Sequence, residues 1–97
     1  MTNKNLVKKM ENLKMGERYV VETVNPDMTE YADKFYKGHI FTVVREKEGQ
    51  VYVSFDDDIR LSKYREELAP VYYLSSEIWS NILVSKIEKT EEETLEN

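Results

Sequence analysis

Tyr36-Lys37-Gly38-His39-Ile40-Phe41-Thr42-Val43-Val44, a polar turn through Glu46-Lys47-Glu48-Gly49-Gln50, and Val51-Tyr52-Val53-Ser54-Phe55-Asp56-Asp57-Asp58 together decide the fold of this chain. Both apolar runs are rich in β-branched and aromatic residues, and a glycine-containing polar turn separates them. The pattern predicts a β-hairpin whose second strand runs into three consecutive carboxylates.

Further strands are predicted on either side of this hairpin. Residues 19–24 are β-branched and aromatic and end at the turn residues Asn25-Pro26-Asp27, and residues 71–74 follow Pro70. Residues 78–87 match both a strand and a helical period, so both alternatives stay open for this segment.

Two segments between these strands are predicted to be irregular. Residues 28–37 form a longer loop, in which Tyr31, Phe35 and Tyr36 are spaced to cover one end of the barrel. Residues 59–69 mix charged and apolar side chains, which predicts a loop whose apolar residues turn inward.

The two ends of the chain differ from the middle. Leu6, Met10 and Leu13 recur at i, i+4 and i+7, which predicts a short amphipathic helix that packs on the barrel or forms a homodimer contact. Residues 90–97 hold four acids and one apolar residue, which predicts disorder. The expected organisation is an N-terminal helix over 1–15, one domain over 16–88 and an acidic tail over 89–97.

Length and composition limit the kind of protein. A chain of 97 residues can bury one modest core and therefore forms one domain. It contains no cysteine, which excludes disulfides and thiolate metal sites and suits a reducing compartment. No signal-peptide pattern and no run of eighteen apolar residues occurs, so we expect a cytoplasmic protein without membrane association.

The charge pattern indicates the chemistry of a partner. The net charge is −5, although residues 1–15 carry +3 and residues 71–97 carry −4. Binding to a phosphate backbone depends on Lys and Arg that displace counterions, so direct nucleic-acid binding is the less favoured alternative. It would rest on Lys4, Lys8, Lys9, Lys34 and Lys37. A basic protein surface is the expected complement.

The hairpin carries a family resemblance. Lys37-Gly38 opening a strand, with a partner strand that ends in Phe55-Asp56, resembles the central hairpin of SH3-like barrels of the KOW-related kind. The resemblance implies a mainly β, SH3-like, partly open barrel. The chain is also similar to small acidic SH3-like proteins of bacteriophages and prophages. That similarity implies host takeover in the host cytoplasm, by binding and inhibiting a basic nucleic-acid-binding host protein as a DNA mimic.

The residues expected to contact such a partner are acids and tyrosines. Carboxylates would face the Lys and Arg residues of the partner, and tyrosines could alternatively line a groove that recognises a peptide or a subunit. The predicted partner-binding residues are Asp56, Asp57, Asp58, Glu46, Glu48, Glu66, Glu67, Tyr31, Tyr36 and Tyr64.

No catalytic residue, metal or cofactor is predicted. The three aspartates lack the alternating spacing and internal glycine of a calcium loop, and no serine lies in a nucleophile-elbow motif. His39, the only histidine, is expected to be a half-exposed strand residue rather than a base or a ligand. The sequence therefore predicts a binding protein and not an enzyme.

Overall fold

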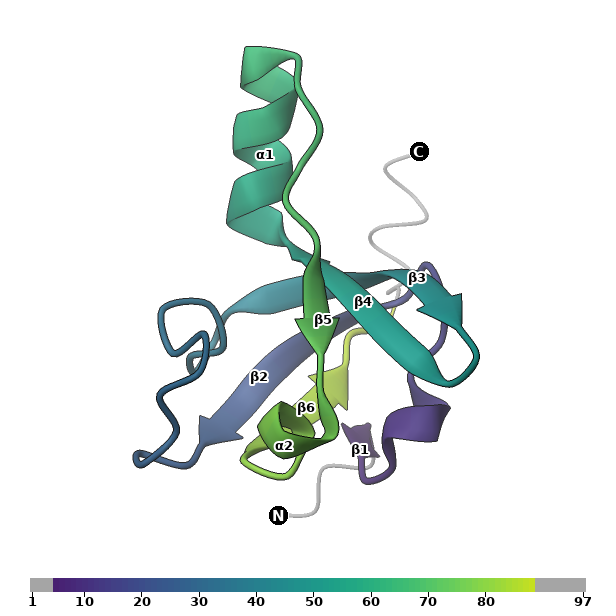
Figure 1. Ribbon diagram of the computed structural model, residues 1–97, viewed down its shortest axis with the longest axis vertical. Coiled ribbons are helices and arrows are strands. Elements are labelled where there is room, and N and C mark those ends of the chain that lie inside the picture. Colours follow the sequence, from purple (N-terminus) through teal and green to yellow (C-terminus); the bar gives the residue numbers. More distant parts are fainter. Residues whose placement is uncertain (1–4, 89–97) are drawn as a thin grey trace.

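The computed structural model describes residues 5–88, which form one antiparallel six-stranded sheet and two short helices (Figure 1). The strands are β1 (Leu6–Val7), β2 (Arg18–Val24), β3 (Ile40–Lys47), β4 (Gln50–Phe55), β5 (Tyr72–Leu74) and β6 (Ile82–Lys86). The helices are α1 (Asp56–Arg65) and α2 (Ser76–Trp79), and a 3-10 turn, η1, covers Met10–Asn12. The mainly β prediction is confirmed.

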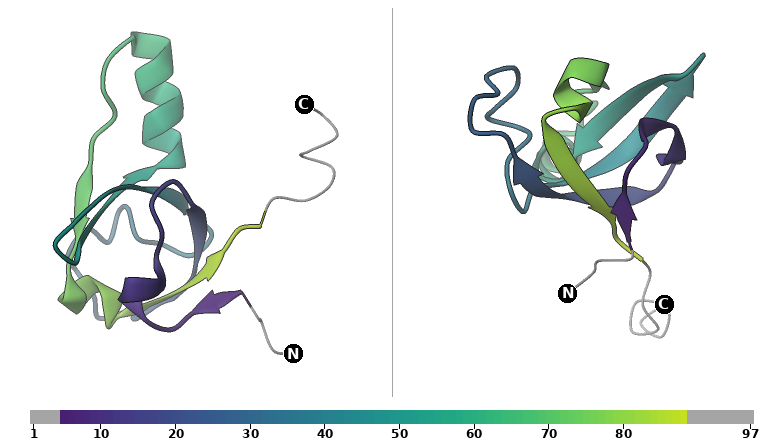
Figure 2. Two further views of the ribbon diagram at one scale, coloured as in Figure 1. Left: turned by 90° about the vertical axis from the view of Figure 1, so that its right-hand side faces the viewer. Right: turned by 90° about the horizontal axis from the view of Figure 1, so that it is seen from below.

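The strands follow the order β1-β6-β2-β3-β4-β5 across the sheet. Register shifts between Val21 and Thr23 in the β2–β6 pair, and between Val43 and Arg45 in the β3–β4 pair, mark irregularities of the kind that bend strands. The sheet is accordingly curved (Figure 2). It is not a closed barrel, because β1 and β5 are its two edges.

The predicted hairpin is confirmed. Lys47 pairs with Gln50, so the turn between β3 and β4 consists of Glu48 and Gly49, whose φ values are +52° and +81°. Two consecutive positive φ values are typical of a type I′ turn, which matches the twist of the adjoining strands. The second strand ends at Phe55, however, and the three aspartates belong to the first turn of α1.

The core lies on the inner face of the curved sheet. Alternation along β3 and β4 directs Phe41, Val43, Val53 and Phe55 inward, and Phe35 reaches the same core from the loop before β3. The other buried apolar residues are Leu13, Tyr19, Val21, Val51, Leu74, Ile78, Ile82 and Val84. The core therefore includes residues from β2, β5 and β6 as well as from β3 and β4. The sequence predicts these three strands at residues 19–24, at residues 71–74 and within residues 78–87.

The prediction of an N-terminal α-helix is wrong for the residues that the structure describes. Leu6 and Val7 form β1, and Leu6 pairs with Ser85 of β6. A helix of about ten residues is marginal in water, whereas pairing with β6 satisfies the backbone at a sheet edge. Leu13 is buried in the core and Met10 packs against it, so both serve the molecule's own interior. The tail predicted over 89–97 lies outside the described residues.

Segment 59–69, predicted as an irregular loop, belongs mainly to a helix. Helix α1 buries none of its side chains and projects away from the sheet (Figure 1). Segment 78–87 combines both of its alternatives, because Ile78 and Trp79 end α2 and residues 82–86 form β6. The Ser75 hydroxyl caps α2 by accepting a hydrogen bond from the Ile78 N–H at 3.1 Å. No helix within residues 5–88 has the length and apolar character needed to cross a lipid bilayer.

Candidate functional site

The three consecutive aspartates each contact a cationic or titratable side chain of the same molecule. Arg18 Nη2 of β2 lies 2.5 Å from Asp56 Oδ2, and Lys34 Nζ lies 2.9 Å from Asp58 Oδ2. His39 Nε2 lies 3.1 Å from Asp57 Oδ1, a distance that forms an ion pair when the imidazole is protonated. These contacts tie the first turn of α1 to β2 and to the loop before β3. The aspartates therefore do not form the free acidic array that the sequence predicts.

His39 is buried, which corrects the prediction of a half-exposed strand residue. Its ring stacks between Tyr36 and Phe55, with centroid distances of 4.4 Å and 4.6 Å. Its Nδ1 lies 2.6 Å from the carbonyl oxygen of Lys34, which can only accept a hydrogen bond, so Nδ1 carries the proton. Its Nε2 is close to Asp57 but is not aligned for a hydrogen bond. The ring closes the core beneath the base of α1.

The environment of Asp57 predicts a defined acid dependence of stability. Partial burial acts to raise the pKa of this carboxyl, but the hydrogen bond from the Asp58 N–H, at 2.7 Å, and the charges of His39 and Lys34 lower it overall. A lowered pKa in the folded state means that the contribution to stability is present above the ordinary value of 3.8 and disappears as the pH falls through the folded value. We expect urea unfolding of the wild type to lose free energy below about pH 4 more steeply than that of Asp57→Asn. A difference between the two proteins that stays constant from pH 6 to pH 2 would contradict this assignment.

The other predicted acids lie in two further places. Glu46 and Glu48 are at the β3–β4 turn, where the Glu46 carboxylate accepts a hydrogen bond from the Gly49 N–H at 3.1 Å. Glu66 and Glu67 follow the far end of α1, and Glu66 ends the helix in the left-handed conformation with φ of +57°. The β3–β4 turn and the far end of α1 point in different directions (Figure 1). The predicted acids therefore do not share one face.

The three predicted tyrosines also do not line one groove. Tyr31 meets Tyr72 edge-on at 5.2 Å, and Tyr36 stacks on His39, so both rings pack on the body of the protein. Tyr64 lies on α1 and is 87% exposed. Tyr52 and Tyr73, which are not among the predicted partner-binding residues, have rings 5.4 Å apart on neighbouring strands.

Helix α1 and the return segment, residues 66–71, form a projection that we call the arm. The large apolar side chains Leu61, Tyr64, Leu68 and Val71 are exposed along it, with Leu68 96% exposed. Acids in the first turn of α1 and Lys63 and Arg65 in its last turn are favourable for the helix dipole. These end charges can be recognised in the sequence and indicate a helix, although the segment has no apolar period. The arm thus contains a helix with favourable end charges that is held at its first turn and buries none of its side chains.

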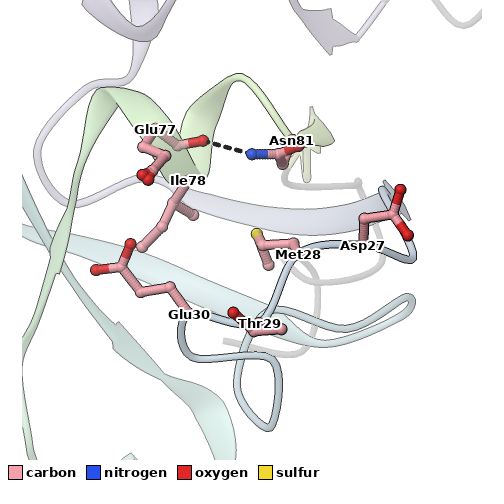
Figure 3. A pocket seen from close by; sticks show the side chains of 7 residues that line it. All are labelled: Asp27, Met28, Thr29, Glu30, Glu77, Ile78 and Asn81. Carbon is pink, nitrogen blue, oxygen red and sulfur yellow. Dashed lines mark hydrogen bonds between the residues drawn. The ribbon is translucent and has the colours of Figure 1, made fainter.

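A small acid-lined cavity lies between α2 and the loop after β2 (Figure 3). It measures about 180 Å³ and is lined by Asp27, Met28, Thr29, Glu30, Glu77, Ile78 and Asn81. Asn81 holds the two sides together, because its side chain donates to the Glu77 carbonyl at 2.9 Å and accepts from Asn25 at 2.8 Å. We call this cavity the acidic pocket.

The acids of the pocket differ from Asp56, Asp57 and Asp58 because no cationic side chain in the described part of the chain pairs with them. Within residues 5–88, the carboxylates of Asp27, Glu30 and Glu77 form no ion pair or hydrogen bond with the chain. In Figure 3, Glu30 and Glu77 lie toward one end of the pocket and Asp27 toward the other, with Met28 between them. The uncompensated negative charge of this region therefore lies at the pocket, which the sequence analysis did not single out.

A second, larger cavity lies between η1 and the β3–β4 hairpin. It measures about 460 Å³, and its lining includes Met10, Leu13, Met15 and Val51 together with Glu46. Methionines make an adaptable apolar surface. Only Glu46 of the predicted partner-binding residues reaches it.

The described residues offer no metal centre, since residues 5–88 contain no group of three His, Asp or Glu side chains placed to hold a metal ion. Comparison with known proteins found no family model, no curated protein and no solved structure that matches the chain. The arm and the acidic pocket are therefore the two features from which a function can be proposed.

Proposed function

We propose that the protein is a non-enzymatic binding protein that presents its arm to a protein partner. The observation that carries this proposal is the arm itself, a helix of 10 residues without one buried side chain. An isolated helix of this length is marginal in water, and several large apolar side chains exposed on one short projection are typical of an interaction site. Binding of a partner along α1 would cover these side chains and stabilise the helix.

The arm also has the composition of an interface. Tyrosine and arginine dominate the residues that contribute most to binding between proteins, and Tyr64 lies on the arm next to Arg65 and one helical turn from Arg60. The base of the arm is held by the Arg18–Asp56, His39–Asp57 and Lys34–Asp58 contacts. These contacts hold the first turn of α1 and leave its last turn, which carries Tyr64 and Arg65, accessible to a partner.

The test places a photoreactive residue at position 64 and, as a matched control, at the exposed Thr23 of β2. Irradiation in a nuclease-treated bacterial lysate should yield a protein adduct at position 64 that is absent at position 23. Against the purified partner, Tyr64→Ala should weaken binding about 30-fold or more, as expected of a hot-spot side chain. Equal adducts from both positions, or unchanged affinity of Tyr64→Ala, would refute the proposal.

A second candidate function is the binding of a basic protein by the acidic surface. The observation that favours it is the free charge of Asp27, Glu30 and Glu77 in the acidic pocket. Inhibition of a basic host protein by a phage-encoded, SH3-like DNA mimic is the specific form that the sequence resemblance implies. Because Asp56, Asp57 and Asp58 contact the molecule's own side chains, that form would depend on the pocket acids. Neutralising Glu30 and Glu77 separates the two candidates, since arm binding to such a partner would be unaffected.

A further inference from the structure

We propose that the partner of the arm is a second copy of this chain, whose acidic pocket receives the basic side chains of α1. This inference rests on the proposed function, because it identifies the protein to which the arm binds. It joins two features of the described residues that have complementary charge and no partner of their own, the arm and the acidic pocket.

The outer face of α1 is basic. Arg60, Lys63 and Tyr64 are exposed and lie three and four positions apart, which places them on one face of the helix. Within residues 5–88 neither Arg60 nor Lys63 forms an ion pair, while the pair between Arg65 and Glu67 is long, at 3.9 Å. A protein of net charge −5 therefore carries two unpaired cations beside an exposed tyrosine on α1.

The acidic pocket fits a single long basic side chain. At about 180 Å³ it is smaller than the cavities of about 300–1,000 Å³ that hold small-molecule ligands. Met28 lines the pocket and is half-buried, so part of its side chain is available to contact the methylene stem of Arg or Lys. The Glu30 and Glu77 carboxylates can then pair with the cationic end. Tyr64 would remain free to cover the rim.

The geometry requires two molecules. The arm projects from one end of the protein and α2, which borders the pocket, lies at the other, in both Figure 1 and the left view of Figure 2. Pairing of two arms through the face that carries Arg60 and Lys63 is disfavoured, because it would bring like charges of the two arms together. The contact is therefore head-to-tail, and repeated contacts of this kind build rings or open chains.

The experiment is sedimentation analysis of the full chain at concentrations up to about 1 mM, since a small interface of this type binds weakly. The wild type should form concentration-dependent oligomers, and high salt should weaken their formation, because it screens charges beyond a few ångströms. Two charge reversals, Arg60→Glu/Lys63→Glu on the arm and Glu30→Lys/Glu77→Lys at the pocket, should each weaken self-association at least 10-fold. Lys37→Glu/Lys47→Glu, which makes the same charge change on exposed lysines outside the arm, is the control and should associate like the wild type.

Mixing the two reversed variants is the decisive step. The pocket variant keeps a normal arm and the arm variant keeps a normal pocket, so the wild-type contact is restored between unlike molecules. The reversed arm and the reversed pocket also carry opposite charges, so heterodimers and larger mixed oligomers should form, although each variant alone does not associate. Circular dichroism establishes that each variant is folded, and Arg60→Ala/Lys63→Ala replaces the arm reversal if that variant unfolds.

Several outcomes would overturn the inference. A wild type that stays monomeric at all concentrations would do so, and would leave the proposed function standing if Tyr64 still yields a specific adduct with another protein. Oligomers that form equally in the arm variant would overturn the inference as well. A mixture of the two reversed variants that yields no heterodimer would overturn it too. A nucleic acid that binds the wild type and is released from the arm variant, with no self-association, would replace the second copy with a different class of partner.

Discussion

Replacing Phe55 with alanine is expected to lower the free energy of unfolding by about 3–5 kcal/mol, the usual cost of truncating a buried phenylalanine. The side chain is fully buried at the end of β4, and its ring packs against Phe35 at 5.0 Å, Phe41 at 6.0 Å, Tyr72 at 5.5 Å and His39 at 4.6 Å. A domain of this size has a total stability of about 5–15 kcal/mol, so the variant should be close to unfolding. Urea denaturation followed by circular dichroism measures the loss.

Two controls separate this effect from general sensitivity to mutation. Phe55→Leu keeps most of the apolar volume and should cost about 1–2 kcal/mol, because the aromatic contacts are lost while the cavity stays small. Tyr64→Ala removes an aromatic side chain that is 87% exposed and should change stability by about 0.5 kcal/mol or less. If Phe55→Ala costs no more than Tyr64→Ala, the core described here is incorrect.

The second large effect is expected from Asp58→Ala, which should cost about 2–3 kcal/mol. Lys34 and Asp58 form two contacts at 2.9 Å and 3.1 Å, and their side chains are only 17% and 14% exposed. Loss of the carboxylate leaves the Lys34 ammonium largely desolvated without its partner. The hydrogen bond to Asp58 outweighs burial and raises the pKa of Lys34. The stability that depends on the Lys34 charge is therefore fully present at pH values below its ordinary pKa of 10.5 as far as Lys34 is concerned, and it is lost as the pH rises through the folded value.

Asp56→Ala is the matched control for Asp58→Ala. It removes a neighbouring carboxylate that also forms an ion pair, but the Arg18 and Asp56 side chains are 44% and 24% exposed. Exposed pairs contribute about 0–1 kcal/mol, so this variant should be clearly the more stable of the two. Equal losses would show that burial does not distinguish the two pairs. A double-mutant cycle between Lys34 and Asp58 then measures the pair itself.

Much of the sheet could be predicted because its strands carry local signals. The β3–β4 hairpin, β2 and β5 combine β-branched and aromatic residues with turn residues at their ends, and these patterns depend on neighbours in the sequence. The N-terminal segment was predicted wrongly because its local pattern also depends only on neighbours in the sequence. Leu6, Met10 and Leu13 match a helical period, but the pairing of Leu6 with Ser85 is a contact between distant parts of the chain that no local pattern reveals.

The candidate site was harder to predict for two physical reasons. Helix α1 has no buried face, so the apolar period that identifies most helices is absent, and only the charges at its ends indicate it. The charge state of a carboxylate depends on cations brought near it by folding. Asp56, Asp57 and Asp58 are the most conspicuous acids in the sequence and have partners, whereas Asp27, Glu30 and Glu77 are scattered in the sequence and gather at one cavity without partners.

The place of the arm in the chain has a consequence for how this protein can change over evolution. Strands β4 and β5 are neighbours in the sheet, and Val53 pairs with Tyr72, so residues 54–71 occupy the position of a hairpin connection. The part of that connection beyond Asp58 supplies no buried apolar side chain to the core. Its length and composition can therefore diverge while strand register and core remain constant. Descendants of this scaffold would then acquire new binding partners by exchanging one surface connection, without having to fold in a new way.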